Sequence, residues 1–111
     1  MKLKELCQQL GLEGQTAVEK LDVEVTGGYA SDLLSWVMAK AQTGNVWITI
    51  QAHPNIVAVA SLINLAGIII AEGVTPEPAT LEKAEQEGIP ILTTPLTMYT
   101  VAGKLFELGV R

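Results

Sequence analysis

The sequence predicts an α/β domain built on a mostly parallel sheet of four to five strands, with helices on both faces. Strand-like and helix-like segments alternate four times along the 111 residues, which is the pattern of right-handed βαβ crossovers. One strand-like segment, at residues 68–70, is isoleucine throughout, as expected for a strand buried on both faces of a parallel sheet. The length fits one hydrophobic core, so we expect a single domain over residues 1–111.

The first two elements are expected to be a helix and a strand. Residues 2–10 place leucines at three- and four-residue steps before Gly11, which predicts a short amphipathic helix. Residues 22–26 alternate polar and apolar side chains and predict a half-buried strand that ends at Gly27 and Gly28. The chain must turn there within two or three residues, so one of these glycines should adopt a positive φ.

The next helix and strand are predicted over residues 30–41 and 46–50. The apolar residues of the helix share one face, and Ser31 or Asp32 lies near its cap. Trp36 lies off that apolar face and should point outward. The segment 46–50 is rich in β-forming residues.

The helix predicted at residues 55–66 is apolar on nearly every side. We therefore expect more than one neighbour to bury it. Pro54 suits the start of this helix, and Gly67 should separate it from the strand at 68–70.

Three further elements complete the predicted fold. A peripheral helix is expected to begin at Pro78 and to stop at Gly88. A last short strand is expected at residues 89–93, and a final amphipathic helix at about 97–108.

The composition excludes several classes of protein. Charged residues make up 17 % of the chain and the net charge is −5, so no basic surface is available for nucleic acid. One cysteine, Cys7, and one histidine cannot assemble a metal cluster, and we expect no cofactor. The start of the chain has no signal-peptide pattern and no apolar run reaches the length of a membrane span. These features predict a cytoplasmic location.

The candidate ligand site lies on four loops. Ligands of open α/β sheets bind outside the carboxyl ends of the strands, which here would gather residues 26–29, 52–55, 71–74 and 93–95. The candidate ligand-binding residues are Thr26, Gly27, Gly28, His53, Asn55, Glu72, Gly73 and Thr94.

Each part of this site also has a structural interpretation. The pair Gly27 and Gly28 could cradle an anion with backbone N–H groups, but a tight turn explains it equally simply. His53 could transfer protons beside Glu72 or Asp32, whereas a histidine before a proline more often belongs to a helix start. We favour the structural interpretation in both cases and assign no catalytic residue. The enzyme alternative is a small hydrolase or phosphotransferase that uses His53 and Glu72.

A low surface charge also predicts self-association. Trp36 and the helix at 55–66, with Ile56 and Val59, are the candidate interface residues. We expect a homodimer that buries about 800 Å² per partner. The alternative is a monomer whose partner is another protein.

Four stretches of the sequence resemble the DRTGG domain family. They are residues 22–35, 55–60, 66–70 and 87–94. The resemblance extends over nearly the whole chain, in its stand-alone form. It implies the fold of the N-terminal domain of HPr kinase/phosphorylase and a small non-catalytic module.

The resemblance also implies a regulatory or dimerising role, because relatives are fused to CBS-pair pyrophosphatases and to phosphotransacetylases. Stand-alone copies near anaerobe hydrogenase and redox genes imply a connection with those systems, and a nucleotide-sensing module is the alternative. The name serine kinase is not supported, because no GxxxxGK[ST] loop is present.

The chain departs from the family pattern at two loops. His53-Pro54 replaces an Asp-Arg pair, and Ala71-Glu72-Gly73 replaces a Thr-Gly-Gly. A ligand that those family residues bind would differ here or be absent.

Overall fold

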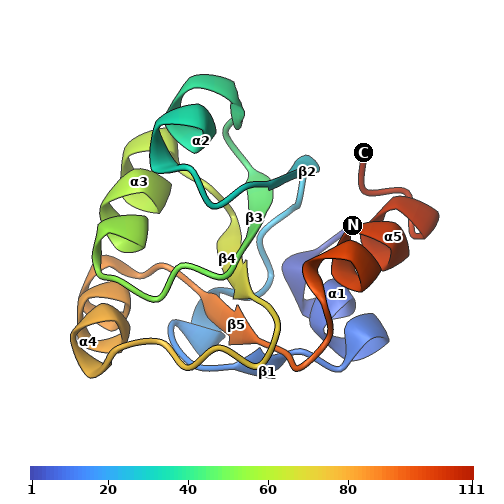
Figure 1. Cartoon of the computed structure of the whole chain (residues 1–111). Coiled ribbons are helices and arrows are strands. Elements are labelled where there is room, and N and C mark those ends of the chain that lie inside the picture. The colour runs from blue at the N-terminus through green and yellow to red at the C-terminus, as the bar shows by residue number, and fades with distance from the viewer.

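The computed structural model describes residues 1–111 as a five-stranded sheet between two layers of helices. The helices are α1 (Leu3–Leu10), α2 (Leu34–Lys40), α3 (Asn55–Ile63), α4 (Pro78–Glu87) and α5 (Met98–Glu107), with a 3₁₀ turn η1 (Val18–Lys20). The strands are β1 (Glu13–Gly14), β2 (Gly27–Ala30), β3 (Asn45–Thr49), β4 (Gly67–Ile70) and β5 (Ile91–Thr93). Figure 1 shows α2, α3 and α4 on one face of the sheet and α1 and α5 on the other. The predicted α/β class, with helices on both faces of the sheet, is confirmed.

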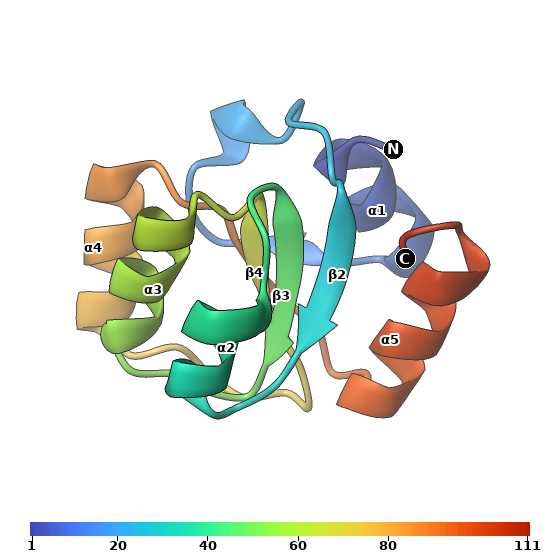
Figure 2. The ribbon, with the colours of Figure 1, turned by 90° about the horizontal axis from the view of Figure 1, so that it is seen from above.

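The sheet order is β1-β5-β4-β3-β2. All neighbouring strands from β2 to β5 run parallel, whereas β1 runs antiparallel to β5. The strand β2 therefore forms one edge of the sheet, and Figure 2 shows it outside β3 and β4. The two-residue strand β1, which the sequence does not predict, forms the other edge.

Each face of the sheet carries its own apolar core. Alternate residues of a strand point to opposite faces, so Ile48 and Ile69 pack with α1 and α5, whereas Trp47, Ile68 and Ile70 pack with α2, α3 and α4. All four residues of β4 are buried. This double burial explains why the strand is apolar throughout.

Several local predictions are confirmed. Pro78 occupies the first turn of α4, and Gly88 ends that helix in the left-handed conformation with φ +69°. The apolar helix α3 contacts both α2 and α4, so more than one neighbour buries it. It stops earlier than predicted, because Asn64 takes the left-handed conformation with φ +62°.

The strand predicted at residues 22–26 is wrong. They form no strand of the sheet and instead contact the start of the chain: the N–H of Leu3 donates to the carbonyl of Val23, and the N–H of Val25 donates to the carbonyl of Met1. The first N–H groups of a helix have no partner within it. The alternating segment thus satisfies one donor at the start of α1, and the carbonyl of Leu21 just before it accepts the N–H of Lys4.

The positive φ predicted at Gly27 or Gly28 is also wrong. Both glycines belong to β2, beside Asn45 and Val46 of β3, and neither has a positive φ. The absence of a side chain at Gly27 avoids crowding, because a Cβ there would lie 3.1 Å from Asn45 Nδ2 and 3.5 Å from the backbone of Arg111.

The helix predicted at residues 30–41 is shorter, at Leu34–Lys40, because β2 extends through Ala30. Ser31 lies near its start as expected, and its hydroxyl accepts the N–H of Leu33. No helix of the fold combines the length and the apolar character that crossing a membrane requires.

Candidate functional site

The carboxyl ends of the four parallel strands gather most of the predicted loops but not all of them. The loops after β3, β4 and β5 carry His53, Glu72 and Thr94. Three of the predicted residues instead lie at the amino ends of the strands, because Gly27 pairs with Asn45, the first residue of β3. They are Thr26, Gly27 and Gly28. The eight predicted residues therefore do not form one site.

Asp32 holds the carboxyl ends of β2 and β3 together. Its Oδ1 atom accepts the hydroxyl of Thr49 at 2.8 Å and the backbone N–H of Ile50 at 2.9 Å. Its backbone carbonyl accepts the side-chain amide of Gln51 at 3.0 Å. This carboxylate serves the sheet and is not positioned beside His53.

His53 and Asn55 form the start of α3. The Nδ1 atom of the exposed His53 ring accepts the backbone N–H of Asn55 at 3.0 Å. This bond satisfies one of the free donors at the beginning of the helix. His53 therefore acts as a helix-start residue, as the structural interpretation predicts.

Glu72 and Gly73 form a turn that carries the start of α5. Both residues have positive φ, +61° and +71°. The carboxylate of Glu72 accepts the N–H of Met98 at 3.1 Å, where a negative charge is favourable at the start of a helix. The N–H of Gly73 donates to the carbonyl of Thr94, and the hydroxyl of Thr94 accepts the N–H of Leu96.

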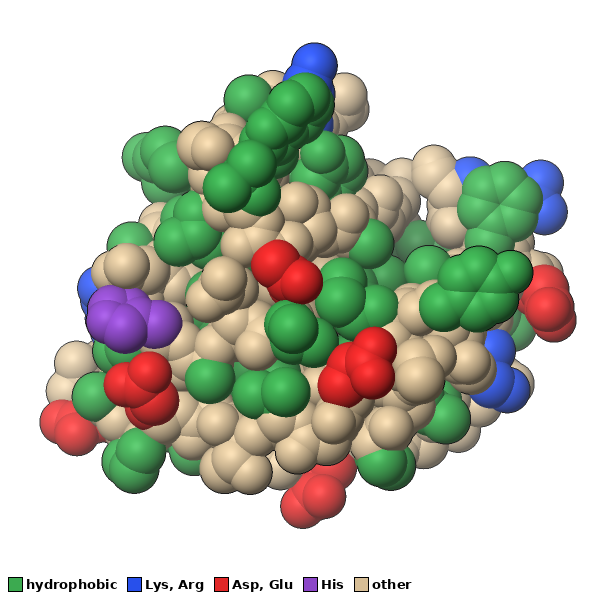
Figure 3. Space-filling view, in the orientation of Figure 1, with side chains coloured by type: hydrophobic (Ala, Val, Ile, Leu, Met, Phe, Trp, Pro, Cys, Tyr) green, Lys and Arg blue, Asp and Glu red, His purple; other side chains and the backbone are tan.

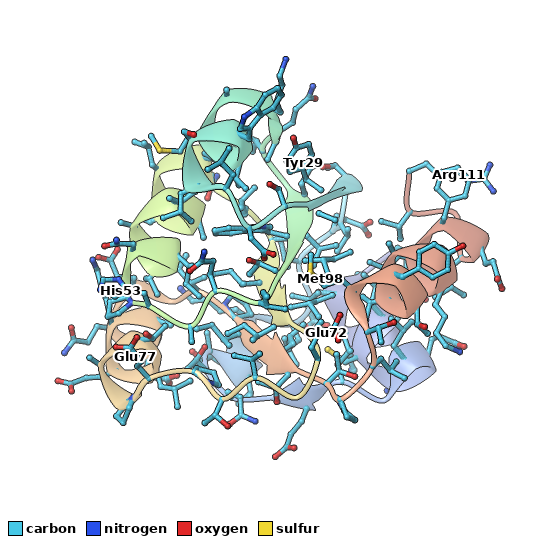
Figure 4. The ribbon with its side chains drawn as sticks, viewed as in Figure 1. Tyr29, His53, Glu72, Glu77, Met98 and Arg111 are labelled. Atoms are coloured by element: carbon cyan, nitrogen blue, oxygen red, sulfur yellow. The ribbon has the colours of Figure 1, made fainter.

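The structure does not bring His53 and Glu72 together. Figure 4 shows them on separate loops, with His53 near the start of α4 and Glu72 near the start of α5. Each side chain contacts the start of its own helix. The geometry that proton transfer between them requires, about 3 Å between heavy atoms, is absent.

An open hollow of about 290 Å³ lies at the carboxyl ends of β4 and β5. Glu13 and Gln15 from the β1 segment face the loops that carry Gly73 and Thr94. Its full lining is Gly11, Glu13, Gln15, Gly73, Val74, Thr75, Pro76, Leu81, Thr93, Thr94 and Pro95. Glu13 is its one ionisable side chain, so it suits a neutral or cationic molecule. We call it the carboxyl-edge hollow.

A second hollow, of about 370 Å³, lies at the amino end of β2. Its lining is Thr26, Gly27, Gly28, Tyr29, Lys40, Gln42, Thr43, Asn45 and Arg111. It contains two cationic side chains and no acidic one, so it suits an anion. We call it the β2 hollow. Gly27 and Gly28 line this hollow from β2 and do not lie at a helix start.

The predicted interface residues differ in accessibility. Trp36 is 51 % exposed, as expected, and the Lys40 ammonium lies 5.4 Å from its ring centre. Ile56 and Val59 are buried in the core beneath α2 and α4, which corrects their assignment as interface residues. The exposed large apolar residue of α3 is Leu62.

No sequence pattern singled out Glu13, Gln15, Lys40 or Arg111. Glu13 and Gln15 reach the carboxyl-edge hollow only because β1 pairs with β5. Lys40 and Arg111 both line the β2 hollow, although they lie far apart in the sequence. Their one sequence signal is that they are two of only seven cationic residues.

Cys7 is a free, half-buried thiol on α1. Desolvation by burial raises its pKa, partly offset by a backbone hydrogen bond. Burial therefore favours the neutral thiol over the thiolate. The structure holds no group of three or more side chains suited to a metal ion.

The chain is a small α/β domain with one open hollow at the carboxyl ends of β4 and β5 and another at the amino end of β2. The chain belongs to the DRTGG domain family, whose model matches residues 18–108. A search of curated proteins found no similar sequence.

The fold is also similar to a solved structure, the CBS and DRTGG domains of the regulatory region of Clostridium perfringens pyrophosphatase, complexed with its activator diadenosine tetraphosphate. The TM-score is 0.74 at 19 % sequence identity. The match covers 92 % of this chain and 44 % of that chain. This chain thus spans less than half of that regulatory region.

Proposed function

We propose that this chain is a regulatory domain that acts by binding a small ligand and by associating with a second copy of itself or with another protein. The observation that carries the proposal is the family match over residues 18–108, together with a fold shared with a regulatory region. The separation of His53 from Glu72 favours binding over the enzyme alternative. A link to anaerobic redox systems, which the resemblance implies, would then depend on the partner of this domain.

The first candidate ligand is a neutral or cationic polar molecule in the carboxyl-edge hollow. Ligands of open α/β sheets bind at this edge, and Gln15, Thr75 and Thr93 offer hydrogen-bonding groups there. Glu13 would attract a cationic group and repel a phosphate.

The second candidate ligand is an adenine nucleotide in the β2 hollow. Lys40 and Arg111 can pair with phosphate oxygens, and Tyr29 offers a ring for stacking. The pyrophosphatase regulatory region, which shares the fold, binds a nucleotide activator. This supports the nucleotide-sensing alternative.

A thermal-shift screen tests ligand binding. The probes are adenine nucleotides, including diadenosine tetraphosphate, and a panel of neutral and cationic nucleosides and amines. A ligand at about 100 times its Kd should stabilise the fold by about 2.7 kcal/mol. If a nucleotide binds in the β2 hollow, its stabilising effect should be lost in Lys40→Gln and kept in Glu13→Gln. If a neutral or cationic probe binds in the carboxyl-edge hollow, its stabilising effect should be lost in Glu13→Gln and kept in Lys40→Gln. If no probe raises the unfolding temperature, small-ligand binding is contradicted.

A further inference from the structure

The carboxyl-edge hollow is bounded by three segments that hydrogen bonds join to one another. The N–H of Gly73, in the loop after β4, donates to the carbonyl of Thr94, in the loop after β5. The side-chain amide of Gln15, beside β1, donates to the hydroxyl of Thr93 at 3.0 Å. These bonds fix the walls of the hollow, so a ligand would not have to order them. Its volume of about 290 Å³ suits a small molecule.

Most backbone N–H groups of this lining are not free to bind a ligand. Pro76 and Pro95 have no N–H group. Other lining residues already donate their N–H groups to carbonyls of the chain, and they are Gly11, Gln15, Gly73, Val74, Leu81 and Thr94. Carbonyl and carboxylate oxygens, in contrast, each accept more than one hydrogen bond. The atoms that remain available are therefore mainly acceptors, so the ligand must supply hydrogen-bond donors.

Two side-chain acceptors lie on the same side of the edge strand. Glu13 and Gln15 are two positions apart along an extended segment, so both point to the same face of the sheet. The only ion pair of the chain joins its amino terminus to Glu24, so the carboxylate of Glu13 has no cationic partner. The Nε2 atom of Gln15 is bonded to Thr93, which leaves its Oε1 atom as an acceptor.

The charge around the hollow favours a cation. Glu13 is the one ionisable side chain of its lining, and the chain carries a net charge of −5. Figure 3 views the molecule toward the loop that carries His53, and shows acidic side chains across this face and cationic ones near its rim. A negative field of this kind raises the local concentration of cations.

Apolar side chains in the hollow favour a guanidinium group over an ammonium group. Val74 and Leu81 line the hollow and are only partly buried. A guanidinium group is planar and more weakly hydrated than an ammonium group, and it presents five N–H donors in a rigid fork. Its edge can donate two parallel hydrogen bonds to a carboxylate such as that of Glu13, while its stem contacts apolar carbons.

We propose that the carboxyl-edge hollow binds a small guanidinium compound. Its N–H groups donate to Glu13 and Gln15, and its hydrocarbon part packs against Val74 and Leu81. The proposal rests on the small-ligand part of the proposed function and names the ligand class of the first candidate site. A regulatory domain with this site responds to a metabolite that carries a guanidinium group.

Isothermal titration calorimetry of the whole chain with butylguanidinium and butylammonium tests this proposal. The two probes have the same stem and the same charge and differ only in the head group. We expect one butylguanidinium per chain, with a Kd at least about fivefold below that of butylammonium. Pentanoate, an anion with a similar stem, should not bind.

Variants locate the binding site. Glu13→Gln should weaken butylguanidinium binding by about tenfold or more, and Gln15→Glu, which adds a second carboxylate, should strengthen it. The control is Glu107→Gln, which removes the same charge from the end of α5, on the other face of the sheet (Figure 1). It should change the Kd by less than about twofold.

Three results would overturn the proposal. The first is no binding of butylguanidinium at concentrations up to about 10 mM. The second is an equal Kd for butylammonium, which would show that only the charge is recognised. The third is equal weakening by Glu13→Gln and Glu107→Gln, which would show dependence on net charge and not on the hollow. In each case a nucleoside or nucleotide that stabilises the fold in the thermal-shift screen would still support small-ligand binding.

Discussion

At the scale of the residue, Asp32 has a structural role that explains its position. Its carboxylate accepts two hydrogen bonds from the end of β3, one of them from the fully buried hydroxyl of Thr49. Hydrogen bonds to a charged acceptor contribute more to stability than neutral ones, about 1.5–3 kcal/mol. Asp32 therefore joins the carboxyl ends of two parallel strands where no ladder bond continues.

Replacing Asp32 should accordingly destabilise the fold. We expect Asp32→Ala to lower the free energy of unfolding by about 1–3 kcal/mol, and Asp32→Asn by less, because an amide oxygen can still accept. Urea unfolding measures the effect. The control is Asp22→Ala, which removes an exposed carboxylate that makes no hydrogen bond. Equal stabilities of Asp32→Ala and Asp22→Ala would contradict this role.

Cys7 offers a second test at this scale. Burial raises the pKa of its thiol, so the thiolate, which is the reactive form, appears only at higher pH in the folded protein. The alkylation rate with iodoacetamide should therefore reach half its maximum at a higher pH in the folded chain than in urea. A folded midpoint at or below the unfolded one would contradict the assigned environment of Cys7.

His53 and Glu72 show how far single residues could be interpreted from the sequence. The loops on which they lie were predictable, because they follow strands with clear patterns. Their partners were not, since the partner of Glu72 is the start of α5, 26 positions away. The structural interpretation of His53, as part of a helix start, did follow from Pro54 beside it.

At the scale of the element, β1 is held by a buried threonine. The hydroxyl of Thr16 donates to the carbonyl of Ile89 at 2.7 Å and accepts the N–H of Ile91 at 2.9 Å. The N–H of Gln15 donates to the carbonyl of Ile91. These bonds attach residues 13–16 to β5, and they place Glu13 and Gln15 in the carboxyl-edge hollow.

Thr16→Val should weaken this attachment. Valine has the same shape but leaves two buried backbone groups without partners, at a cost of about 1–3 kcal/mol. Thr16→Ser keeps the hydroxyl and should lose less. Urea unfolding compares the two variants, and a valine variant as stable as the serine variant would show that Thr16 contributes only packing.

The elements also show why sequence patterns predict some strands better than others. β4 is buried on both faces, so its apolar run is distinctive. β1 has two exposed residues and β2 begins with two glycines, so neither carries a strand pattern. The alternating segment at 22–26 forms no strand of the sheet, and the carbonyl of Val23 accepts a hydrogen bond from the start of α1 instead.

At the scale of the whole molecule, the low content of charged residues is matched by exposed apolar side chains on particular helices. Ten large apolar side chains are exposed, and five of them lie on α2, directly before it, or on α5: Leu33, Trp36, Met38, Tyr99 and Phe106. The sequence indicated self-association and the exposure of Trp36. It could not predict that β2 is an edge strand, because the order of strands in a sheet depends on contacts between distant segments.

Light scattering after gel filtration at micromolar concentration tests most directly whether this domain associates with a second copy of itself, as the proposed function states. We expect a mass near twice 11.8 kDa. Trp36→Ala, which removes an exposed aromatic side chain from α2, should shift the mass toward that of one chain. A mass near 11.8 kDa at every concentration would contradict self-association.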